Sequence, residues 1–65
     1  MTEAEYNRRI DALITERDAL WARYDALVAT HGVWSTQAEA ALIAASNAED
    51  AVQTTAREFL RELES

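Results

Sequence analysis

Side chains that carry out chemistry are few in this sequence, and their spacing matches no catalytic or metal-binding pattern. There is one His and no Cys, and we find no Gly-rich phosphate loop and no nucleophile beside a base. His31 is the only His, and it falls in the last turn of a predicted helix, where a cation suits the helix dipole. We expect neither an enzyme nor a protein with a metal or cofactor.

Acidic side chains form the most regular polar pattern. Asp11, Asp18 and Asp25 recur every seven residues, so on a helix they lie in one row with about 10.5 Å between neighbours. We interpret this row as a solvated face. Imitation of nucleic-acid phosphates is the functional alternative, and contact with a partner protein is another.

The element that positions this row is a heptad helix. Residues 10–30 read IDALITE, RDALWAR, YDALVAT, which places apolar side chains along one helical stripe. With Ile10 at heptad position a, the other a and d positions fall on Tyr6, Leu13, Arg17, Leu20, Tyr24, Leu27 and His31.

Signals for helix ends divide the chain into two helices. Thr2 with Glu5 fits a capping box, and Gly32 is the only Gly, placed where a helix can stop. Ser35 or Thr36 can cap the next helix, with Glu39 completing a second box. We therefore expect an all-α chain with helices over about 3–31 and about 36–63, joined by a turn at 32–35. A turn this short makes an antiparallel helical hairpin.

A second apolar seam, expected at Ala38, Leu42, Ala45, Glu49, Val52, Ala56, Phe59 and Leu63, matches the first when the helices run antiparallel. Tyr6 then meets Phe59 near the termini. Arg17 and Glu49, the lone charges of the two seams, fall in the same layer. We interpret them as a buried ion pair that fixes the register, because a slip by one heptad would leave both charges unpaired.

Ile14, Trp21 and Val28 lie at position e, beside the seam, where we expect the second helix not to cover them. Such a stripe is an interaction surface, and the simplest partner is a second copy. We expect Ile14 to face the mate's Val28 around a two-fold axis near Trp21, with Leu60 reaching toward the mate's Trp34, in a four-helix bundle. A different protein on the same stripe is the alternative.

Trp34, beside Val33 in the turn, is predicted either to cover the end of the core or to anchor a partner. The outer side of the second helix is weakly apolar, with Ala40, Ile43, Ala44 and Ala51. Small side chains of this kind favour the helix, and they could also let another helix approach closely.

Size and charge restrict the classes of function. With 65 residues and no Cys, the chain is one small domain that oligomerisation would help to stabilise. The net charge of −6 disfavours nucleic acid and anionic membranes as partners. No apolar run is long enough to span a bilayer, so we expect a cytoplasmic protein.

We therefore expect a homodimeric module that regulates or inhibits another protein, of the kind that phages and mobile elements encode. A structural subunit of a larger assembly is the first alternative. In length and shape the expected dimer is similar to Rop, a plasmid RNA-binding protein that is also a dimer of short hairpins. That resemblance implies a second alternative, an RNA-binding dimer, with Asn7, Arg8, Arg9 and Arg23 as the candidate contacts.

Overall fold

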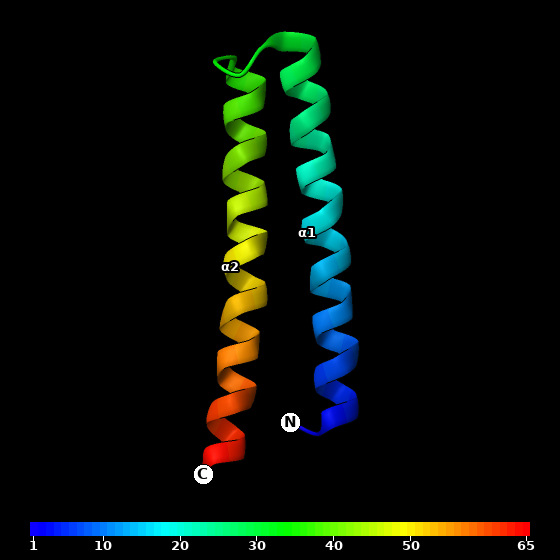
Figure 1. The fold of residues 1–65 in the computed structure, drawn as a ribbon, viewed down its shortest axis with the longest axis vertical. Coiled ribbons are helices and arrows are strands. Elements are labelled where there is room, and N and C mark those ends of the chain that lie inside the picture. Colours follow the sequence, from blue (N-terminus) through cyan, green and yellow to red (C-terminus); the bar gives the residue numbers. More distant parts are fainter.

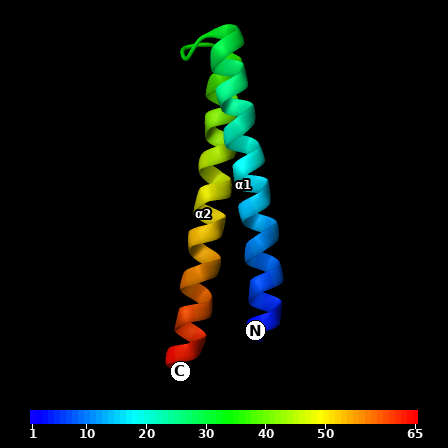
Figure 2. The same cartoon turned by 45° about the vertical axis from the view of Figure 1, so that its right-hand side comes forward.

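Two long helices make up the whole chain in this computed structural model, which describes all 65 residues. Helix α1 spans Glu3–His31 and helix α2 spans Thr36–Glu64. They run antiparallel and side by side, so both termini lie at one end and the turn at the other (Figures 1 and 2). The helical hairpin is confirmed, and its bounds differ from the predicted ranges by one residue, at the end of α2.

The helix starts follow from single hydroxyl caps. Thr2 Oγ1 accepts a hydrogen bond from the backbone N–H of Glu5 at 3.1 Å. Ser35 Oγ accepts one from the N–H of Ala38, also at 3.1 Å. Of the two caps considered for α2, Ser35 is therefore the one used, and Thr36 is the first helical residue. Ser35 also donates its hydroxyl to the Gly32 carbonyl oxygen at 2.9 Å, which ties the turn to the new helix.

Gly32 ends α1 with a backbone conformation that other residues rarely adopt. Its φ is +91° and its ψ is 155°, a region of the map that is essentially confined to glycine. Its N–H still donates to the Val28 carbonyl oxygen at 2.8 Å, so the last turn of the helix is closed. The chain then reverses within four residues.

The core is a seam of small side chains on α2. The buried residues are Ala38, Ala41, Ala45 and Thr55, and all four belong to α2. Helix α1 buries no residue completely; its large side chains at the seam are half-buried. Large residues of α1 therefore pack over small residues of α2, which lets the two helices approach closely.

The predicted seam of α2 was wrong at two of its eight positions, Leu42 and Leu63. Leu42 and Leu63 are exposed, whereas Ala41 and Thr55 are buried and Ala48 is half-buried. The physical reason is that α1 directs large side chains toward α2 at three of every seven positions. Small side chains of α2 pack best opposite them. At the end with the termini the prediction holds: Tyr6 and Phe59 stack with ring centroids 4.1 Å apart and planes at 12°.

Candidate interaction surfaces

Two broad faces flank the seam, because the hairpin is only one helix thick. Its Cα atoms extend 47 × 17 × 10 Å. We place Ile10 of α1 and Ala38 of α2 at heptad position a. With 3.6 residues per turn, positions e and b of both helices then share one face, and positions g and c share the other. The first, here named the acidic face, consists of Asp11, Ile14, Asp18, Trp21, Asp25, Val28, Glu39, Leu42, Ser46, Glu49, Gln53, Ala56, Leu60 and Leu63. The second, the alanine face, consists of Glu5, Arg9, Ala12, Glu16, Ala19, Arg23, Ala26, Gln37, Ala40, Ala44, Asn47, Ala51, Thr54, Glu58 and Arg61.

Charge is divided unevenly between these faces. The acidic face carries five carboxylates, Asp11, Asp18, Asp25, Glu39 and Glu49, and the only cation beside them is Arg17 in the seam. The other arginines lie on the alanine face or on the outer edges. On the alanine face three arginines balance three glutamates. Most of the net charge of −6 is therefore concentrated on one side of the molecule.

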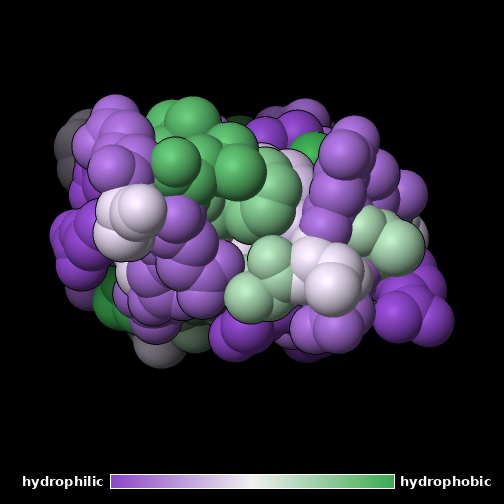
Figure 3. Space-filling model, turned by 90° about the horizontal axis from the view of Figure 1, so that it is seen from below, coloured by the Kyte–Doolittle hydropathy of each residue, from purple (hydrophilic) through white to green (hydrophobic).

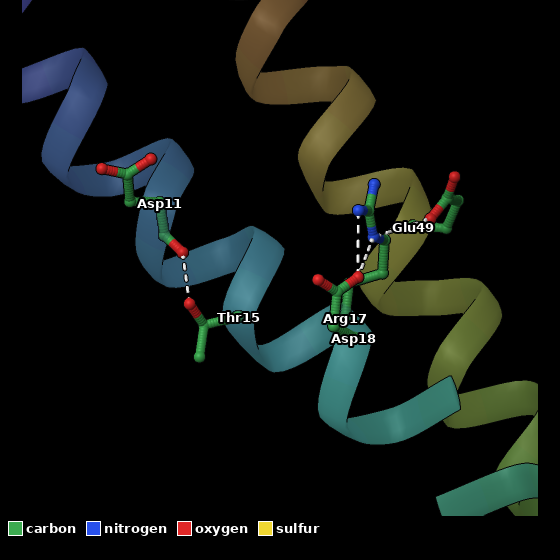
Figure 4. A network of polar contacts seen from close by, with 5 residues as sticks. All are labelled: Asp11, Thr15, Arg17, Asp18 and Glu49. Carbon is green, nitrogen blue, oxygen red and sulfur yellow. Dashed lines mark hydrogen bonds and ion pairs between the residues drawn. The ribbon is translucent and has the colours of Figure 1, made fainter. Parts of the chain in front are cut away.

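Arg17 joins the two helices at the centre of the acidic face (Figure 4). Its Nε lies 3.4 Å from Glu49 Oε2. Its Nη2 lies 3.0 Å from Asp18 Oδ1, and its Nε also donates to that oxygen at 3.2 Å. The register thus brings Arg17 and Glu49 together, but Arg17 also binds Asp18, its neighbour in the chain.

The prediction that this ion pair is buried was wrong. The exposed fractions of the Arg17 and Glu49 side chains are 27% and 39%. Water therefore reaches both groups, because the small side chains of α2 leave the edge of a two-helix seam open. An exposed pair of this kind contributes about 0–1 kcal/mol to stability.

We expect Arg17→Leu to change the free energy of unfolding by less than about 1 kcal/mol. The Glu49 carboxylate would lose its ion-pair partner but stay solvated by water. Leu at position 17 would extend the apolar seam. Urea denaturation followed by circular dichroism measures the change, with Arg57→Leu on the outer edge as the control. A loss of several kcal/mol in Arg17→Leu alone would show that Glu49 depends on the pair.

The apolar stripe of Ile14, Trp21 and Val28 is less open than predicted. All three side chains are half-buried. Leu60, the fourth residue expected in a dimer interface, is 57% exposed. Asp11, Asp18 and Asp25 are all exposed.

A hollow opens at the turn end of the acidic face. Its volume is about 380 Å³, and its lining is Tyr24, Val33, Trp34, Ala38, Glu39 and Leu42. The Trp34 side chain is 95% exposed, so it does not cover the end of the core, and that interpretation was wrong. The rings of Trp21 and Tyr24 pack edge to face, with centroids 5.8 Å apart and planes at 87°. The hollow therefore continues the half-buried stripe toward the turn.

Apolar side chains also reach the surface at the opposite end, beside the termini (Figure 3). Met1, Tyr6, Phe59 and Leu63 line a second hollow there, together with Glu3 and Asn7. Leu63 is exposed for most of its surface.

The alanine face holds a broader groove. Its volume is about 560 Å³, and it is lined by Arg23, Leu27, Thr36, Gln37, Ala40, Ala41 and Ala44. Ile43 is exposed on α2 nearby. Ala40 and Ala44, two of the weakly apolar positions noted in the sequence, line this groove. The α1 residues that line it, Arg23 and Leu27, could be identified only from how the helices pack.

No three His, Cys, Asp or Glu side chains lie close enough together to hold a metal ion. Neither helix is long and apolar enough to cross a membrane. Comparison with protein-family models, with curated proteins and with solved structures finds no match to this chain.

Proposed function

We propose that this hairpin is a protein-interaction module that forms a homodimeric four-helix bundle and regulates or inhibits another protein by binding it. The observation that supports the proposal is the amount of surface that the single chain leaves uncovered. Only 4 of the 65 residues are buried. Seven large hydrophobic side chains are exposed, including Trp34 and Leu60.

The exposed area can be compared with that of an ordinary globular protein. The chain exposes 4736 Å² for a mass of 7.3 kDa, whereas a compact monomer of this mass exposes about 4200 Å². A broad face of 47 by 17 Å is close to the ~800 Å² that each partner contributes to a standard interface. One such contact would bury more area than the chain exposes in excess of a compact monomer.

The alanine face suits a second copy better than the acidic face does. Its charges balance, and its small side chains allow two helix pairs to pack closely. Dimerisation on the acidic face around an axis near Trp21 would place Asp18 level with the mate's Asp25, among carboxylates of both copies, and like charges repel. We therefore assign the dimer contact to the alanine face, in place of the stripe that sequence reasoning favoured.

The experiment is sedimentation equilibrium at micromolar concentration. We expect twice the monomer mass of 7.3 kDa for the wild type. Ala40→Glu, which puts a charge into the groove of the alanine face, should give the monomer mass. The matched control Ser46→Glu lies on the acidic face of the same helix and should remain dimeric.

Other outcomes would contradict the proposal in different ways. A monomeric wild type would contradict the four-helix bundle. A dimer that only Ser46→Glu disrupts would show that the dimer contact lies on the acidic face instead. A mass well above the dimer would support the structural-assembly alternative. The RNA-binding alternative has no comparable support, because neither broad face carries a net positive charge.

A further inference from the structure

We propose that the acidic face is the docking site for a cationic amphipathic helix of the partner protein. This inference rests on the proposed function, since it names the chemistry of what the module binds. It combines two properties of the same face: an apolar stripe that ends in an exposed Trp, and carboxylates on both sides of that stripe.

The apolar part has the length of a helix-binding site. The stripe from Ile14 to Val28 extends about 21 Å along α1, equal to about four helical turns. It continues into the hollow of about 380 Å³ beside Tyr24 and Leu42. Trp34 stands at the rim of this hollow and is 95% exposed, and Trp is one of the residue types enriched among those that dominate binding energy.

The charges on this face favour a positively charged partner. Asp11, Asp18 and Asp25 border the stripe on α1, and Glu39 and Glu49 border it on α2. The only nearby cation, Arg17, is already bound to Asp18 and Glu49. A helix with Lys or Arg at every seventh position would meet the Asp row at its own spacing of about 10.5 Å.

A helix fits this surface better than an extended peptide does. A peptide that binds as a β-strand adds to the free edge of a sheet. Here 50 of the 54 backbone–backbone hydrogen bonds lie inside the two helices, so no edge is available. A groove between two helices instead accepts apolar side chains spaced three and four residues apart on a third helix.

The probe is a synthetic peptide of 21 residues without Trp, with Leu at positions repeating every three and four residues and Lys on both flanks. Titration uses the fluorescence of Trp21 and Trp34, the two Trp residues of the chain. A scrambled peptide of the same composition separates helix docking from simple charge attraction. We expect saturable binding of the patterned peptide that weakens with added salt, and at least tenfold weaker binding of the scrambled peptide.

Charge variants locate the site. The triple variant Asp11→Asn, Asp18→Asn and Asp25→Asn should weaken binding about tenfold, as three exposed ion pairs of ordinary strength would. The matched control Glu3→Gln, Asp50→Asn and Glu64→Gln removes the same charge from exposed positions outside both faces and should change binding less than twofold. Trp34→Ala should weaken binding by at least tenfold.

Equal binding of the two peptides, or an equal loss in the two triple variants, would overturn the proposal. The same titration of Ala40→Glu separates this inference from the dimer. Binding by a monomeric Ala40→Glu would support the docking site without depending on self-association. A wild type that dimerises but binds no patterned peptide would leave the bundle standing and reject this site.

Discussion

Ala45→Asp is expected to unfold the hairpin. Ala45 is 0% exposed and lies in the seam between the helices. A carboxylate at this position would lose its water without gaining a partner, which costs several kcal/mol. Small domains hold at most about 5–15 kcal/mol in total, and a chain with four buried residues lies near the lower limit. Far-ultraviolet circular dichroism at 25 °C should show the loss of most helical signal.

Ala22→Asp is the matched control for this effect. Ala22 is exposed in the middle of α1, so the substitution has the same helix-propensity cost but buries no charge. The control should keep its helical signal and melt within a few degrees of the wild type. If the two variants melted together, the seam of small residues would not be the core.

Gly32→Ala is expected to destabilise the hairpin by about 1–3 kcal/mol, because its backbone conformation is one that L-residues rarely adopt. The φ of +91° and ψ of 155° set this cost. A Cβ at Gly32 would meet nothing within 4 Å, so crowding does not contribute. Urea denaturation of the variant and the wild type measures the difference in unfolding free energy.

A chain with D-Ala at position 32 isolates the backbone cause, and 65 residues are within reach of chemical synthesis. A D-residue accepts positive φ and restricts the unfolded chain, so this variant should be at least as stable as the wild type. Equal destabilisation by the L- and D-residues would point to the added methyl group instead of the backbone.

Much of the fold was predictable because its signals are local and periodic. The heptads of α1, the hydroxyl before each helix and the single Gly each act within a few residues. They predicted two helices and their ends. The antiparallel register followed from matching the seams, and the stacking of Tyr6 on Phe59 at 4.1 Å agrees with it.

The rotation of α2 about its own axis could not be predicted in the same way. Its sequence has apolar side chains at both Ala41 and Leu42, so either residue could face α1 in the seam. Bulk favours Leu42 when the helix is considered alone. Packing favours Ala41, because α1 supplies the large side chains of the interface. The exposure of Arg17 and of the open faces depends on that rotation, so the candidate surfaces became clear only in three dimensions.

The short turn also sets the order in which the hairpin assembles. Near the turn, Leu27 lies beside Ala41 in the same groove, and only a short loop must close to bring them together. Tyr6 and Phe59 meet at the far end, and closing that longer loop directly costs about 1.2 kcal/mol more in chain entropy. We therefore expect the helices to pair first beside the turn and then toward the termini. We expect opening to follow the reverse order, so that the aromatic stack is lost while the Trp34 end is still closed.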